Sequence, residues 1–292
     1  MESARSWGWR LGAGIVALLL SPGLPALTAS RWRRGVVFEL VELGVYLLAV
    51  GAGWFSWATG FWLGLLLLLA WRMIAAVDAI QAPAAAKQMP WAMLVGMALG
   101  LLFGKEGVAL FLRANVVEAF QSPNQGMAPT LVLGDKFFVG KHVAEVHRGD
   151  VLVFRRPDAT GSPYVKRVIG IGGDLVAMTG DHLTVNGTPV KRRVTDESCP
   201  VVVESGSCVV WEETLEGRAY RVLAISSPRD EKWSVTVPPD SYFVLGDNRD
   251  NSNDSRHFGS VPKANRIGVP TFIWWSKDEA GFRLDRLNRR VE

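Results

Sequence analysis

The pattern of apolar and polar positions changes near residue 112. Before it, long runs of Leu, Ala, Gly and Trp predominate; after it, apolar and polar residues alternate over short stretches. Runs of about 20 apolar residues are long enough to cross a bilayer, whereas alternation with period two is typical of strands with one buried face. The pattern therefore predicts a membrane domain at 1–112 and an all-β domain at 113–292.

Three apolar segments in the first part have the character of transmembrane helices. They cover about 36–54, 57–71 with an extension through 77, and 91–112, and the last contains the adjacent charges Lys105 and Glu106. A further apolar stretch at 11–30 is interrupted by prolines before it reaches the length of a full crossing, about 20 residues. It has the composition of a signal peptide or an interfacial segment, so the sequence favours three crossings and leaves its placement open.

Basic residues between the spans predict their orientation. An Arg cluster at 31–34 precedes the first span, and Arg72 and Lys87 lie between the second and third, whereas the loop at 55–60 has no basic residue. Short loops rich in Arg and Lys remain in the cytoplasm. We therefore expect the β domain outside the cytoplasm.

The β domain is divided into short strand candidates by Gly, Pro and Asp. They lie at 135–141, 150–156, 164–174, 182–190 and 242–247. The Asn186-Gly187 pair predicts a two-residue hairpin turn inside the fourth candidate. Residues 195–217 have the character of an insertion, and the basic stretch 283–292 is expected to be solvated.

Charge and cysteine content narrow the function classes. The net charge of +4 suits anionic lipid or nucleic acid, but no basic run with interleaved aromatics is present, so we expect a bilayer and no nucleic acid. The four His have no ligand or triad spacing, and we predict neither a metal nor a cofactor. Cys199 and Cys208 are either two unrelated thiols or, if the β domain is exported, a disulfide, which we expect.

The densest polar stretch follows the last strand candidate. Residues 247–257 contain three Asp, three Asn, two Arg and two Ser. Short polar side chains that bond to the backbone fix a loop, and rigid loops often carry sites. This stretch, read as Gly246 to Arg256 and followed by Gly259, Val261 and Pro262, resembles the C-terminal motif of bacterial signal peptidase I.

The resemblance covers about 113–275 and implies both fold and activity. The expected fold is N-terminal transmembrane α-helices plus an all-β, antiparallel, barrel-like domain on the periplasmic or extracytoplasmic side of the bacterial inner membrane. Members of the family release signal peptides from exported preproteins with a Ser nucleophile and a Lys general base. Such a Lys needs a pKa lowered by burial.

Several residues here match the family's site. The string 162–174 resembles its Lys-bearing motif, which makes Lys166 the general base, between the largely apolar neighbours Tyr164 and Val168 on one strand face. Ser252 and Asp254 match residues that orient the Lys. Charge-assisted hydrogen bonds are expected to hold the loop together through Asp247, Arg249 and Arg256.

The nucleophile position departs from the family pattern. The run 127–131 matches the family's Met-x-Pro-Thr-Leu, with Met127 and Pro129 expected at the substrate groove, but the Ser before this Met is Gly126. A second family Ser, counted with the oxyanion hole, is Asn124. Ser122 is a substitute candidate, yet four extended residues span about 13 Å, too far from Lys166 unless the loop is rebuilt.

Two functions remain in competition. The first is a catalytically impaired family member that binds signal peptides of exported preproteins, with the bilayer and an active paralogue as further partners. The alternative is a signal peptidase I that is active through a substitute nucleophile, or an enzyme that was inactivated when its serine at residue 126 was replaced. A transporter has little support, because the spans contain a single internal charge pair, Lys105 and Glu106.

Overall fold

A computed structural model describes residues 32–51, 58–81, 113, 115–141, 145–157, 161–201, 208–225 and 231–292. The chain forms two compact units, Met1–Val116 and Val117–Glu292. The apolar stretch at 11–30, the third predicted span at 91–112, Lys87 and His142 lie outside the described residues.

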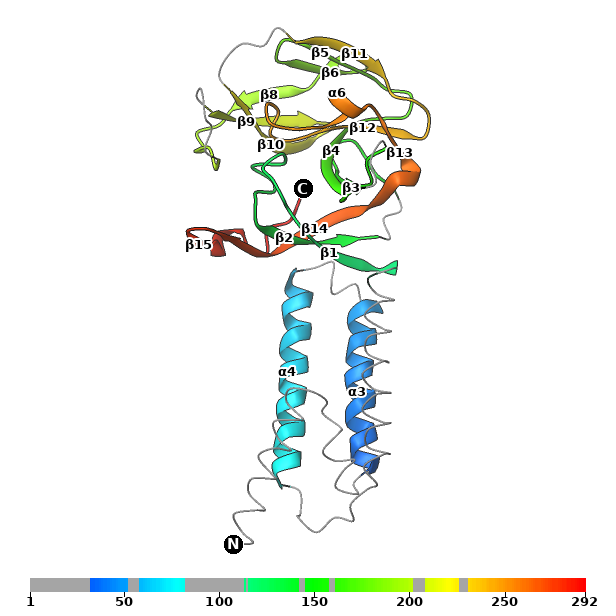
Figure 1. Cartoon of the computed structure of the whole chain (residues 1–292), viewed down its shortest axis with the longest axis vertical. Helices are drawn as coiled ribbons and strands as arrows, with labels where there is room; N and C mark the ends of the chain where they lie inside the picture. The colour runs from blue at the N-terminus through cyan, green and yellow to red at the C-terminus, as the bar shows by residue number, and fades with distance from the viewer. Residues whose placement is uncertain are drawn as a thin grey trace. The chain divides into compact units, whose positions relative to one another are not determined.

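The first unit contains two long helices, α3 (Trp32–Gly51) and α4 (Ala58–Gln81) (Figure 1). α3 covers most of the first predicted span, and α4 covers the second from residue 58 and continues through the expected extension to 77. Within the described residues, one stretch is long and apolar enough to cross a membrane, Trp62–Gln81 in α4.

Ion pairs join the two helices. Buried Glu42 of α3 accepts from Arg72 of α4 at 2.8 Å, and Arg34 pairs with Asp78 at 3.1 Å. Charges are tolerated in apolar surroundings when they meet a partner. The expectation of a single internal charge pair in the spans was therefore wrong, because the pairing of distant charges on neighbouring helices is not visible in local sequence.

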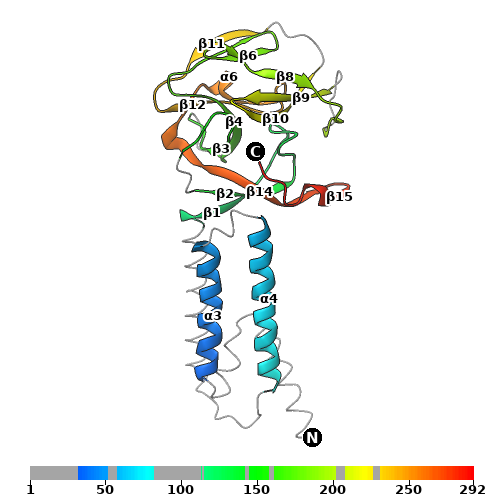
Figure 2. The same cartoon turned by 180° about the vertical axis from the view of Figure 1, so that it is seen from behind.

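The second unit is built from antiparallel strands in three sheets (Figures 1 and 2). The largest is an open sheet in the order β1-β2-β14-β3-β4-β12-β13, with β15 paired to β14. Its strands are β1 (Val117–Gln121), β2 (Asp135–Gly140), β3 (Val151–Phe154), β4 (Tyr164–Ile171), β12 (Ser241–Leu245), β13 (Val261–Pro262), β14 (Arg266–Asp278) and β15 (Gly281–Phe282).

Two smaller sheets complete the unit. One has the order β11-β5-β6-β7 and the other β10-β9-β8. Their strands are β5 (Leu175–Thr179), β6 (His182–Val185), β7 (Thr188–Pro189), β8 (Lys191–Val194), β9 (Cys208–Leu215), β10 (Arg218–Ile225) and β11 (Lys232–Thr236). Short helices lie at α6 (Ser255–Phe258), η2 (Lys263–Asn265) and η3 (Leu284–Arg286).

Each of the five strand candidates contains an observed strand. The predicted hairpin is also present: Asn186 and Gly187 have φ of 52° and 75° and join β6 to β7. Positive φ at both central positions is the requirement of the turn type that matches strand twist. Cys199 and Cys208 are joined in a disulfide with a Cα–Cα distance of 5.9 Å.

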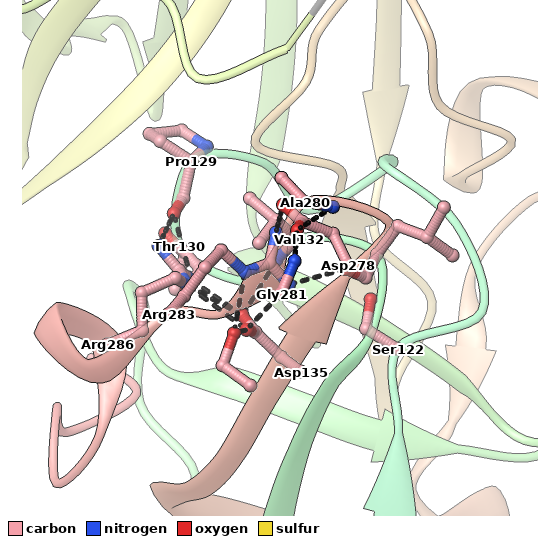
Figure 3. A network of polar contacts seen from close by, with 12 residues as sticks. Ser122, Pro129, Thr130, Val132, Asp135, Asp278, Ala280, Gly281, Arg283 and Arg286 are labelled. Carbon is pink, nitrogen blue, oxygen red and sulfur yellow. Dashed lines mark hydrogen bonds and ion pairs between the residues drawn. The ribbon is translucent and has the colours of Figure 1, made fainter.

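The C-terminal stretch 283–292 is mostly exposed, as its basic composition suggested, but two of its residues are buried. Val291 is 5% exposed and packs in a core cluster with Met127. Arg286 is 6% exposed because its guanidinium donates to the buried carboxylate of Asp135, at 2.6 Å, and to the carbonyl of Thr130, at 3.0 Å (Figure 3). Asp135, a buried acid 151 residues away in the chain, thus holds Arg286 in the interior.

Candidate active site

The polar loop after β12 is positioned by strand pairing. Leu245 at the end of β12 lies opposite Arg167 of β4, which brings the following residues beside Lys166. A Cβ on Gly246 would lie 2.0 Å from the Ser252 hydroxyl oxygen and 2.5 Å from the Gly126 carbonyl oxygen. Only glycine permits this close approach, so Gly246 allows the loop to pack against the segment that contains Gly126.

Lys166 is buried within this arrangement, with 5% of its surface exposed. Desolvation lowers the pKa of its ammonium group from 10.5 to about 8, although the carboxylates of Asp254 and Asp247 act in the opposite direction. Its Nζ lies 3.0 Å from the point that a Cβ on Gly126 would occupy. The amine therefore faces the place where a side chain at residue 126 would begin.

The backbone of Gly126 is fixed on both sides. Its N–H donates to the side-chain Oδ1 of Asn124 at 3.0 Å, and its carbonyl accepts from the Asn248 N–H at 3.2 Å. The Asn248 side chain also donates to the carbonyl of Gln125 at 3.2 Å. Buried Met127 follows directly, so the segment is held against the loop above and the core below.

Asp254 is the carboxylate whose charge acts most strongly on Lys166. It accepts from Nε and Nη2 of Arg256, both at 2.9 Å, and from the Gly246 N–H at 2.9 Å. Burial alone would raise its carboxyl pKa, but the hydrogen bonds and charge of Arg256 lower it on balance. The Ser252 hydroxyl is buried without a well-aligned hydrogen bond in the described part of the chain, yet it lies near enough to help stabilise the Asp254 carboxylate.

The sequence of this chain matches a known protein family. The signal peptidase family, peptidase S26, matches residues 89–275. The chain is 35% identical over 200 residues to a signal peptidase I of Pseudomonas aeruginosa, covering 58% of this chain and 68% of the relative. It belongs to the signal peptidase family.

Other signal peptidases match at comparable levels. That of Leptolyngbya laminosa is 32% identical over 185 residues, covering 60% of this chain and 76% of the relative. The crystal structure of a signal peptidase I from Enterococcus faecalis is 29% identical and covers 44% of this chain and 97% of that chain, with a TM-score of 0.28.

In this chain, the charged residues of the loop after β12 are anchored differently from our expectation. Asp247 and Arg249 were expected to hold the loop together, but their partners lie on neighbouring strands. Asp247 receives a bidentate pair from Arg167 of β4, at 2.6 and 2.8 Å, and Arg249 pairs with Glu213 of β9, at 2.5 and 2.7 Å. Of the three, Arg256 bonds within the loop, to the Asp254 carboxylate and to the Arg249 carbonyl.

Arg167 is the supporting residue that sequence reasoning missed. It is 1% exposed on the opposite face of β4 from Lys166, and it also donates to the carbonyls of Gly149, at 2.7 Å, and Glu292, at 3.0 Å. The signal was an arginine next to the lysine inside an otherwise apolar strand. Val165 and Ile169 lie on either side of Arg167 on the second face of β4, and these apolar neighbours indicate that this face is buried as well.

Ser122, the candidate substitute nucleophile, is engaged elsewhere. Its hydroxyl donates to the Asn124 carbonyl at 3.0 Å, and its N–H donates to the Asp135 carbonyl at 2.8 Å. The residue lies in the segment between β1 and β2, close to the Asp135 network (Figure 3). Within the described residues, no group of three or more His, Cys, Asp or Glu is arranged to hold a metal ion.

Proposed function

We propose that this signal peptidase family protein binds the signal peptides of exported preproteins and cleaves them poorly or not at all. One observation carries the proposal: the buried amine of Lys166 lies 3.0 Å from the Cβ position of residue 126, and that residue is glycine. The arrangement contains a base and its supports without a hydroxyl for the base to activate. In a well-studied serine protease, loss of the nucleophile costs about 10⁶ in kcat.

An open strand edge supports peptide binding next to Lys166. β3 pairs with β4 from Tyr164 to Arg167, whereas β12 pairs with β4 only from Arg167 onward. On the β12 side, residues 164–166 therefore have no strand partner among the described strands. A peptide added there as a strand gains backbone hydrogen bonds, and this mode of binding needs no serine.

The membrane is the proposed location of this binding. The apolar stretch Trp62–Gln81 of α4 has the length of a membrane anchor. Two features support a β unit on the outer side of the inner membrane: the distribution of Arg and Lys around the predicted spans, and a disulfide, which suits an oxidising compartment. The peptide would then meet the site as it emerges from the bilayer.

A binding and cleavage assay on the full chain in detergent tests the proposal. A fluorescent signal peptide should bind saturably by anisotropy and remain intact on a gel. Gly126→Ser should gain slow cleavage that Lys166→Ala abolishes, while Gly126→Ala, which adds the same Cβ without the hydroxyl, should gain none. Absence of peptide binding, or cleavage by the unaltered chain as fast as by an active family member, would refute the proposal.

A further inference from the structure

The side chain of Asn124 accepts a hydrogen bond from the backbone N–H of Gly126, a donor that acyl-transfer chemistry at residue 126 requires. Its Oδ1 accepts the N–H of Gly126 at 3.0 Å and lies 3.2 Å from the Cβ position of that residue. Lys166 Nζ lies 3.0 Å from the same point. The carboxamide oxygen and the amine therefore flank the place where a nucleophilic side chain would begin.

This N–H has a specific chemical value. In serine proteases, the backbone N–H of the nucleophilic residue is one of the donors that stabilise the oxyanion of the tetrahedral intermediate. An N–H carries one proton and makes one good hydrogen bond. While Asn124 accepts it, the carbonyl oxygen of a bound peptide cannot.

The backbone around Asn124 favours this contact. A side-chain oxygen that accepts the N–H two residues ahead is the local bond for which Asn is suited. The Asn124 carbonyl is held by the Ser122 hydroxyl at 3.0 Å, and the Gly126 carbonyl is held by the Asn248 N–H at 3.2 Å. With the chain fixed on both sides, release of the Gly126 N–H requires rotation of the Asn124 side chain.

We infer that Asn124 is a second block on the chemistry, independent of the missing serine: its amide oxygen takes the position of the scissile carbonyl oxygen and keeps the oxyanion donor of residue 126 occupied. The inference rests on the proposed function and makes it more specific. A bound signal peptide is held by strand pairing, but its scissile carbonyl oxygen cannot accept a hydrogen bond from the N–H of residue 126. Restoring a serine at residue 126 alone is therefore insufficient for efficient turnover.

The test compares substitutions of Asn124 in the Gly126→Ser background. Asn124→Ser should raise kcat by about 10² to 10³, the value of one oxyanion donor, with KM changed less than threefold. Asn124→Ala should give part of this gain, because it frees the N–H without adding a hydroxyl. Asn124→Asp, which keeps an acceptor of the same shape, should give none.

Peptide binding to the chain with Gly126 intact gives a readout that does not depend on turnover. Asn124→Ala should tighten signal-peptide binding about fivefold, the equivalent of one hydrogen bond of about 1 kcal/mol. If neither Asn124→Ser nor Asn124→Ala exceeds the kcat of Gly126→Ser, or if Asn124→Ala lowers it, the inference is wrong. Failure of the proposed function has a different signature, namely an unaltered chain that binds no signal peptide or cleaves it rapidly.

Discussion

Replacing Lys166 with Met removes the buried charge while keeping a side chain of similar length. Desolvation lowers the pKa of this lysine from 10.5 to about 8 in the folded protein. Between these two pH values the unfolded chain binds more protons than the folded one, so the stability of the unaltered protein rises with pH in this window. Below about pH 8 both states are protonated and the folded protein bears the whole cost of the buried charge.

The size of the effect follows from the two pKa values of Lys166. At about 1.4 kcal/mol for each pH unit, the interval from 10.5 to about 8 corresponds to about 3 kcal/mol. The stability advantage of Lys166→Met over the unaltered chain should therefore shrink by up to about 3 kcal/mol between pH 7 and pH 10.5.

Urea unfolding of the full chain in detergent, followed by near-ultraviolet circular dichroism, measures this difference. Subtracting the two proteins cancels other groups that titrate in the window. The same substitution at exposed Lys191 of β8 controls for loss of one positive charge. A difference between Lys166→Met and the unaltered chain that does not vary with pH would show that the amine is not desolvated, and the assignment of a base would fail.

The remaining predictions concern the supports and the topology. Arg167→Met leaves the carboxylate of Asp247 buried without its guanidinium and should destabilise the protein by about 3–5 kcal/mol in thermal or urea unfolding; a loss under about 1 kcal/mol would contradict the role given to this pair. Alkylation without reductant, followed by mass spectrometry, should leave Cys199 and Cys208 unmodified, whereas two labelled thiols would exclude the disulfide. Protease added to intact spheroplasts should digest the β unit and spare the loop at Lys87, and the reverse pattern would invert the topology.

Local sequence signals identified the elements that depend on local physics. The Asn186-Gly187 turn is one example, because its positive φ values are required by the turn itself. Period-two alternation located the strands around Phe137, Val151 and Val244, whose side chains are buried. Lys166 followed from a motif resemblance together with its apolar neighbours on one strand face.

The longest strand, β14 at Arg266–Asp278, was not predicted because its pattern is irregular. It pairs first with β3 and then with β2, with several shifts of register that interrupt a clean alternation. It also contains Pro270, which lies opposite Val139 and is unusual within a sheet because proline cannot donate to the ladder. Only the observed pairing explains this segment.

Partners far apart in the chain were likewise beyond local reasoning. Arg167 and Asp247 are separated by 80 residues, and Arg249 and Glu213 by 36. The composition of the polar loop indicated that charge-assisted bonds form, but it could not indicate which strand supplies the partner. The contact between Asn124 and Gly126 is local. Its importance is visible only in the structure, where Lys166 Nζ lies 3.0 Å from the Cβ position of Gly126.

The central claim is that residue 126, whose Cβ position lies 3.0 Å from the Lys166 amine, offers this base no hydroxyl to activate. Treatment of the full protein with a serine-directed acylating inhibitor, followed by peptide mass spectrometry, tests it directly. The unaltered chain should acquire no stoichiometric adduct, while Gly126→Ser should acquire one at residue 126 that Lys166→Ala prevents. A stoichiometric adduct on any serine of the unaltered chain, Ser122 and Ser252 included, would contradict the account.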